Sequence, residues 1–377
     1  MLCKSYINVL LVFVPIGIIA GGLGFAAATV FFLNFLAIIP LALFTAIWAG
    51  ELSASVGHVL GGILNATLGN AVEIIVGAIA VGQGEIHIAQ WSLLGSILSG
   101  SLPVLGISFF LAGYGKESLN FDKTLTGILS SLVMIASASL IVPTVVSSAF
   151  QRLDPLEAHT DSRTLILSRG TAIILFILFI IYLYFKLETH TNLFLYSIAN
   201  TSATNEERRA CNSAEEEEGP TLGPWASSCA LIITTLCVFR CASYLIHSAS
   251  GSAVALSMSK SFIGIVLIPI VSNAAKWATA VTSRNHRMDL VIRATLGSVL
   301  QITLFVAPLL ILLGWLLQQP MTLNFRVFEA GVFFLTVIVV NCLIHDGRTN
   351  YFEGAMMMGT YIIIAVAFYV RSDPAGV

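Results

Sequence analysis

One carboxylate stands in the middle of an apolar stretch that is long enough to cross a bilayer. Glu73 lies within residues 60–81, LGGILNATLGNAVEIIVGAIAV, three residues after Asn70. An ionised side chain in hydrocarbon costs at least about 2.5–3.5 kcal/mol, so such a residue marks a functional site by default. A carboxylate and an amide on one helix face present oxygen atoms, which are the ligands of hard cations such as Ca²⁺.

The same pattern recurs in the second half of the chain with a change of charge. Residues 70–73, NAVE, align with residues 273–276, NAAK, so that Lys276 stands opposite the glutamate. Residues 94–98, LGSIL, align with residues 296–300, LGSVL. Two matches in the same order and at nearly the same spacing indicate an internal repeat, which is typical of transporter folds.

Polar side chains around the two motifs are predicted to form a site for a cation or a proton. We expect Asn70 and Glu73 to contribute ligands from the first half, with Glu73 as the metal ligand, and Asn273 to contribute from the second. Pro269 lacks a backbone N–H one turn before Asn273, and the carbonyl that this frees could point at an ion. Interhelical packing is the alternative role for the serines. Further polar groups would come from Ser96, Ser298 and Gln301.

Membrane-length helices must position these residues. The chain has 377 residues, of which 57% are hydrophobic and only 10% are charged, against roughly 25% charged in soluble domains. The apolar runs are continuous and do not alternate, which excludes a transmembrane β-barrel. We therefore expect an all-α polytopic membrane protein with about eleven transmembrane helices. They are predicted at about residues 7–24, 29–50, 60–81, 87–113, 124–149, 164–186, 225–247, 259–283, 288–317, 326–345 and 352–370.

The polar segment 187–223 divides these helices into two sets of five, with one helix left over at the N-terminus. Because five is odd, the second set enters the membrane from the other side, which makes an inverted repeat with a site at the midplane. The acid run Glu215–Glu218 is either a solvated linker or a cation-attracting mouth. The predicted organisation is a peripheral helix in 1–28, repeats in 29–186 and 224–377, and a cytoplasmic acidic linker in 187–223. The Lys and Arg distribution favours a cytoplasmic N-terminus.

Other classes of function find no support in the sequence. No HExxH, GxSxG or paired-aspartate motif is present, and the six cysteines form no CxxC pair, so we expect neither an enzyme nor a bound cofactor. A basic, aromatic surface for nucleic acid is also missing. The predicted partners are the lipid bilayer and the transported ions, Ca²⁺ and H⁺. Self-association into a homo-oligomer is left open.

The motifs themselves resemble a known family. GGILNATLGNAVEIIVGAIAV and GEIHIAQWSLLGSIL resemble the first signature repeat of the vacuolar calcium/proton exchangers of fungi and plants, and SKSFIGIVLIPIVSNAAKWATAVT resembles the second. The likeness covers nearly the whole chain. It implies an eleven-span fold with a peripheral first helix. It also implies exchange of cytosolic Ca²⁺ for lumenal protons at the vacuolar membrane.

The departures from that family lie at the expected site. Where the family's second repeat reads GNAAEH, this chain reads SNAAKW, so that Lys276 replaces the second ion-binding carboxylate and Trp277 replaces a histidine. Further departures are Gly50, Gly100, Arg293 and Val299, where the family usually has an acid, an asparagine, a small residue and a serine.

Lys276 is expected to disfavour calcium, because its ammonium would stand where the metal belongs. Three interpretations follow. The protein is a cation/proton antiporter with altered ion choice or stoichiometry, or a transport-inactive member that acts as a regulatory or structural partner, or a relaxed copy without selected activity. A fourth possibility is that the helix register slips and Lys276 extends to the membrane interface.

Overall fold

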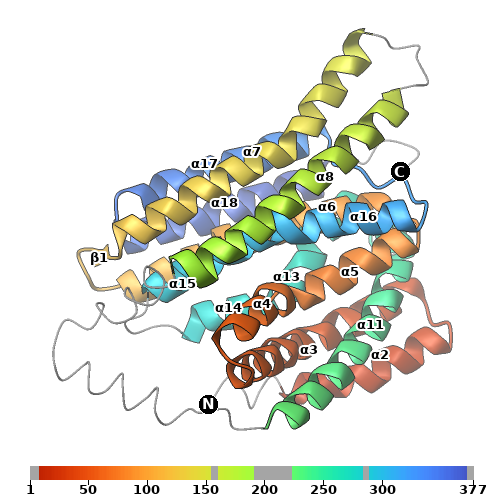
Figure 1. Ribbon diagram of the computed structural model, residues 1–377. Helices are drawn as coiled ribbons and strands as arrows, with labels where there is room; N and C mark the ends of the chain where they lie inside the picture. Colours follow the sequence, from red (N-terminus) through yellow and green to blue (C-terminus); the bar gives the residue numbers. More distant parts are fainter. Residues whose placement is uncertain (1–7, 154–159, 191–222, 283–287, 372–377) are drawn as a thin grey trace.

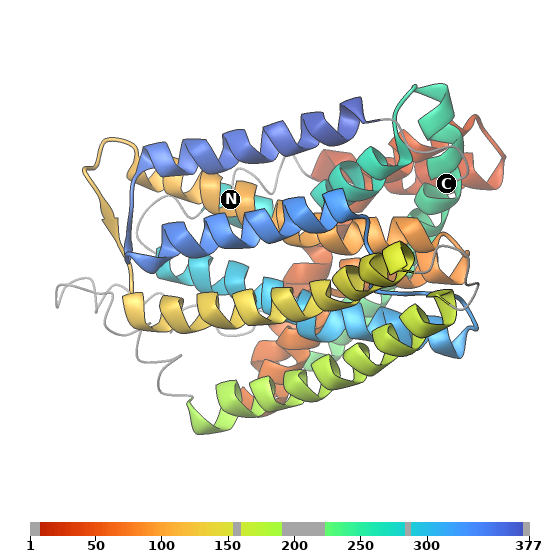
Figure 2. The same cartoon turned by 90° about the horizontal axis from the view of Figure 1, so that it is seen from above.

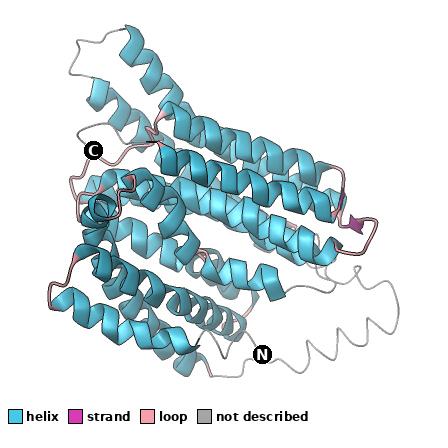
Figure 3. Cartoon of the chain, turned by 180° about the vertical axis from the view of Figure 1, so that it is seen from behind, coloured by secondary structure: helices cyan, strands magenta, loops and turns pink. Residues whose placement is uncertain are grey.

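The protein is built almost entirely of helices, as the computed structural model shows (Figures 1 and 3). Eight helices are long and apolar enough to cross a membrane, two bent helix pairs bring this to ten, and a shorter apolar helix covers Leu10–Gly22. These counts apply to the parts of the chain that the structure describes. The prediction of a polytopic all-α membrane protein is confirmed. The described residues are 8–153, 160–190, 223–282 and 288–371.

The first half begins with the short helix η1 (Leu10–Val12) and α2 (Phe13–Gly22), which pack on the first long helix. The end of the molecule where η2 ends at Thr189 and α11 begins is called the linker side, because the predicted linker joins these two helices. The predicted linker falls mostly on residues 191–222, including the acid run, which lie outside the described residues. The elements that follow are α3 (Ala27–Ser55), α4 (His58–Leu68), α5 (Ala71–Gly82), α6 (Ile86–Gly113), α7 (Lys123–Leu153), α8 (Thr160–Tyr184) and the π-helical turn η2 (Phe185–Thr189).

The second half repeats this order with more interruptions. Helix α11 extends eight residues beyond the predicted end at residue 247, because the hydroxyls of Ser248 and Ser252 donate to carbonyls of the preceding turn and can stay buried in it. The elements are α11 (Pro224–Ala255), α12 (Lys260–Phe262), η3 (Ile263–Leu267), α13 (Ile268–Ser272), α14 (Ala274–Thr282), α15 (Met288–Gln301), η4 (Ile302–Val306), α16 (Ala307–Leu316), α17 (Val327–His345) and α18 (Tyr351–Val370).

The packing of the two halves is mirrored. Helix α8 packs on α16, and its counterpart α18 packs on α6, while α3 pairs with α11 and α7 with α17. Figure 2 shows α7, α17 and α18 with their axes roughly aligned. A short antiparallel pair, β1 (Leu119–Asn120) with β2 (Arg348–Thr349), joins the halves at one end. This arrangement agrees with the inverted repeat expected from the sequence.

Two membrane segments are broken at the residues that the sequence singled out. Helices α4 and α5 are bent by 46° across residues 69–70, and the segment Lys260–Ser272, which ends with α13, is bent by 55° from α14 at Asn273. Broken backbone is tolerated at membrane depth only where protein or a cavity surrounds it. Helix α6 is the main helix in the interior around these breaks, since 89% of its most apolar 18-residue stretch is buried inside the molecule.

Candidate functional site

The two breaks place one charged residue each in the first turn of a new helix. Asn70 precedes α5, and Glu73 lies in its first turn. Asn273 precedes α14, and Lys276 is the third residue of that helix. The N-terminal end of a helix carries a partial positive charge, worth about 0.3–1 kcal/mol to a nearby ion. It therefore stabilises the carboxylate of Glu73 and works against the ammonium of Lys276.

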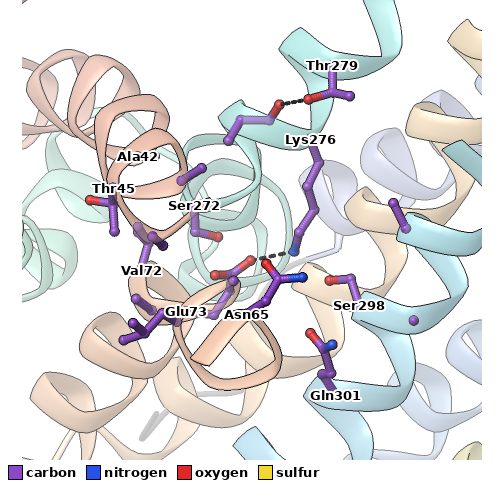
Figure 4. Close-up of a pocket in the computed structure, with 18 of the residues that line it drawn as sticks. Ala42, Thr45, Asn65, Val72, Glu73, Ser272, Lys276, Thr279, Ser298 and Gln301 are labelled. Carbon is purple, nitrogen blue, oxygen red and sulfur yellow. Dashed lines mark hydrogen bonds and ion pairs between the residues drawn. The ribbon is translucent and has the colours of Figure 1, made fainter. Parts of the chain in front are cut away.

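Three side-chain oxygens converge on the ammonium of Lys276. Its Nζ lies 2.7 Å from Glu73 Oε1, 3.1 Å from Asn70 Oδ1 and 2.6 Å from Asn273 Oδ1, and Figure 4 shows the side chain pointing at Glu73. An ammonium has three N–H groups, so each has an acceptor. The side chain of Glu73 is only 4% exposed and that of Lys276 is 18% exposed. We call these three acceptor oxygens the oxygen cage.

Neighbouring polar groups orient the two asparagines. Asn70 Nδ2 donates to Gln301 Oε1 at 2.7 Å, and Ser298 Oγ donates to Asn70 Oδ1 at 2.9 Å. Asn273 Nδ2 donates to Ser99 Oγ at 2.8 Å. Because the nitrogen and oxygen of an amide point in different directions, holding the nitrogen turns the oxygen toward the cage.

The orienting residues occupy equivalent positions in the two repeats. Ser99 follows LGSIL directly, and Gln301 follows LGSVL directly. Each holds the amide of the asparagine from the other half of the chain. The observed contact of Ser96 with the site is made by its carbonyl oxygen, which accepts from Asn273 Nδ2 at 3.2 Å.

A cavity of about 330 Å³ adjoins the oxygen cage. It reaches toward the linker side, because Lys186 and Thr279 line it close to the ends of η2 and α14. Its other walls include Thr45, Asn65 and Arg293. Thr45, Asn65 and Lys186 are not among the site residues predicted from the sequence. Asn65 offered a signal, since it is an amide in the same apolar stretch as Glu73.

A comparison with known families identifies the fold. The family model described as sodium/calcium exchanger protein matches residues 26–188 and 226–370. The chain belongs to this family.

Several curated relatives match over nearly the full length of this exchanger. It is 39% identical over 373 residues to the vacuolar calcium ion transporter of Schizosaccharomyces pombe, which covers 98% of this chain and 85% of the relative. It is 36% identical to vacuolar cation/proton exchanger 2 of Arabidopsis thaliana, with 98% and 82% of the two chains covered. The Ca²⁺/H⁺ antiporter of Synechocystis is 34% identical, with 96% of each chain covered. These matches agree with the resemblance seen in the motifs.

Solved structures support the same assignment. The exchanger matches native YfkE with a TM-score of 0.79 and 27% identity, covering 97% of this chain and all of the other. The H⁺/Ca²⁺ exchanger CAX matches with a TM-score of 0.61 at 12% identity, which shows the shared fold alone.

One expectation about the second repeat differs from the structure of the exchanger. The carbonyl four residues before Pro269, that of Ile265, lies against Gly95 of α6, so it packs between helices and does not point into the cavity. Trp277 packs edge-on against Tyr361, with ring centroids 6.4 Å apart, and it does not contribute to the oxygen cage. Its buried Nε1–H has no hydrogen-bond partner among the described residues.

Lys276 therefore turns toward the site and not toward the membrane interface. In this exchanger the two repeat motifs bring together a carboxylate, two amides and an ammonium. The two charged residues of this group, Glu73 and Lys276, are 203 positions apart in the chain. Near the cavity wall, Asp289 and Asp122 lie close to Arg293, and Asp289 Oδ1 accepts from the backbone N–H of Asp122 at 2.7 Å. The arrangement can hold one positive charge at the oxygen cage, and it does so with the lysine of the chain itself.

Proposed function

We propose that this exchanger is a proton-coupled cation antiporter that binds its ion at the oxygen cage of Glu73, Asn70 and Asn273. The observation that carries the proposal is the convergence of these oxygens on one point beside a cavity inside the membrane fold. The relative from S. pombe is named a vacuolar calcium ion transporter, and the relative from A. thaliana is named a vacuolar cation/proton exchanger. Family membership and these names support exchange of Ca²⁺ or another cation for H⁺.

The coupling follows from competition for the same oxygen atoms. A carboxylate binds a metal ion only when it is deprotonated, so metal binding releases protons and protonation releases the metal. Glu73 would supply this competition from the first half. Asn70, Asn273 and Ser298 would add neutral oxygens, while Gln301 holds Asn70 in its orientation. No enzymatic step and no resident cofactor are part of the proposal.

Lys276 is proposed to weaken calcium binding strongly. A unit charge repels Ca²⁺ about 4 Å away by about 8 kcal/mol at an effective dielectric near 20. The ion must also displace the ammonium from three acceptors, and it gains no carboxylate from the second half. Ordinary calcium exchange is therefore expected to be impaired relative to a variant with an acidic residue at this position.

We place the protein in an internal membrane of the vacuolar type, with the linker side toward the cytosol. The names of the vacuolar relatives and the multi-pass helices support the membrane. The bias of Lys and Arg toward the linker side supports the orientation. In a variant whose native cysteines are replaced by serine, a cysteine in place of the exposed Lys116 should react with an impermeant thiol reagent added from the cytosolic side of intact vacuoles. Protection of that cysteine would reverse the orientation.

Ion uptake into acid-loaded vesicles tests the function. Wild type should dissipate the pH gradient when a cation is added outside, and Glu73→Gln should not. Lys276→Glu combined with Trp277→His should raise calcium uptake above that of wild type. Gradient dissipation that is unchanged by Glu73→Gln would contradict an ion site at this residue.

One observation favours a second candidate, a transport-inactive member that serves as a regulatory or structural membrane protein. All three N–H groups of the Lys276 ammonium have acceptors, so the ion pair could hold the exchanger in one state. Absence of flux in wild type for every cation tested, with calcium flux restored by the double substitution, would favour this candidate.

A further inference from the structure

The oxygen cage already holds one positive charge, and its composition indicates which ion suits it. One carboxylate and two neutral amides surround Lys276 Nζ at 2.6–3.1 Å. The ionised cage therefore neutralises a single positive charge. We propose that the transported ion is a monovalent metal cation and not a divalent one. This proposal rests on the cation antiport proposed above, and it names the substrate class of the same site.

Charge counting separates the two classes of ion. Calcium affinity in proteins follows the number of charged ligands. Glu73 is the only carboxylate among the residues that line the described cavity, while Lys186, Lys276 and Arg293 are cationic. Asp289, the neighbouring acid, lies beside Arg293, so its charge is already engaged. A divalent ion would thus enter a cavity in which the one carboxylate, Glu73, is already matched by Lys276 and in which Lys186 is a further cation.

A cation can enter the cage only when the ammonium moves aside, and the structure provides room for this. The side chain of Lys276 is 18% exposed and borders the cavity of about 330 Å³. A lysine ammonium sits on a flexible four-carbon stem. The hydroxyls of Ser272 and Thr279 also line the cavity and could accept from the displaced group. The ammonium would then remain a few ångströms from the transported ion.

The displaced ammonium discriminates by charge because it repels a divalent ion twice as strongly as a monovalent one. For a separation of about 4–5 Å and an effective dielectric near 20, the difference disfavours the divalent ion by about 10²–10³-fold. This discrimination operates as long as Lys276 keeps its charge. Lys186 acts in the same direction at the cavity wall.

The test uses the purified full-length chain in acid-loaded proteoliposomes. Li⁺, Na⁺, K⁺ and Ca²⁺ are added outside in separate experiments, and internal pH and ²²Na⁺ or ⁴⁵Ca²⁺ uptake are followed. At least one monovalent ion should drive proton efflux at a lower concentration than Ca²⁺. Addition of that ion should also raise the thermal unfolding temperature of the detergent-solubilised protein more than Ca²⁺ does.

Two substitutions and a control separate charge from fold. Lys276→Met keeps the side-chain length and removes the charge, so the ratio of Ca²⁺ to monovalent transport should rise by about 10²–10³-fold. Lys276→Glu should raise it further, because it adds a carboxylate ligand. Lys116→Met makes the same change on an exposed loop, and the ratio should not move.

The outcomes distinguish this proposal from the one on which it rests. Proton-coupled flux of Ca²⁺ in wild type that equals or exceeds every monovalent flux overturns the monovalent proposal and keeps the antiporter. Flux restored only in Lys276→Glu, and only for Ca²⁺, also overturns it. No flux of any cation in wild type and in Lys276→Glu overturns the antiport itself. If a variant fails to fold, the ion series in wild type still decides.

Discussion

Replacement of Glu73 by glutamine should destabilise the protein by leaving a buried cation without its counter-charge. Glu73 and Lys276 are 2.7 Å apart, and the carboxylate side chain is only 4% exposed. Removing one partner of a buried ion pair typically costs about 3–5 kcal/mol. Lys276 is 18% exposed and borders a cavity, so some solvent screening remains, and we expect a cost of about 2–3 kcal/mol.

A double-mutant cycle isolates the interaction between these two side chains. Lys276→Met removes the cation and keeps the volume, so it leaves Glu73 without its ammonium partner. The double variant Glu73→Gln with Lys276→Met has neither charge and loses the electrostatic cost of both single variants. Its destabilisation should therefore be smaller than the sum of the two single effects by about 2–3 kcal/mol.

Thermal unfolding in detergent, at one pH and one salt concentration, provides the measurement. Each single variant should lower the unfolding temperature by several °C, and the double variant should recover most of that loss. Raising the concentration of a salt with a large organic cation, such as choline chloride, should change the result little, because a buried pair is screened less than a surface pair. Strictly additive effects of the two substitutions would show that the Glu73–Lys276 ion pair does not form. The proposal that the oxygen cage binds a cation would then be contradicted.

Two further predictions concern the residues around the cage. Gly95→Ala should prevent correct folding, because an added Cβ would lie 2.2 Å from the carbonyl oxygen of Ile265. The equivalent Gly297→Ala should fold, because its Cβ would meet no atom within 4 Å. Size-exclusion chromatography of the two variants compares how monodisperse they are. Ser99→Ala should raise the apparent KM for the transported cation several-fold with little change in the maximal rate. The reason is that the Asn273 amide loses a hydrogen-bond acceptor at 2.8 Å, which is worth about 0.5–1.5 kcal/mol. Ser99→Thr keeps a hydroxyl and should restore the wild-type KM. A loss of maximal rate without a change in KM would show that Ser99 has no orienting role.

Local patterns in the amino-acid sequence were enough to predict the class of the molecule and the members of the central motif. Hydropathy is a sum over neighbouring residues, so the apolar segments and their approximate number could be predicted from the chain. The repeated NAVE and NAAK motifs indicated that Glu73 and Lys276 belong to equivalent helices. A shared pocket followed from the odd number of helices in each half, without any knowledge of contacts.

The way in which these residues meet depends on the folded arrangement of the helices. The helices break at residues 69–70 and at Asn273. At these two breaks Glu73 and Lys276, which are 203 positions apart in the chain, approach to 2.7 Å. The inclusion of Lys186 in the cavity wall and the orienting role of Ser99 depend on which helix faces are opposed. Such pairings arise from packing between segments distant in the chain, and a local pattern of residue types does not encode the distance or direction of a side chain.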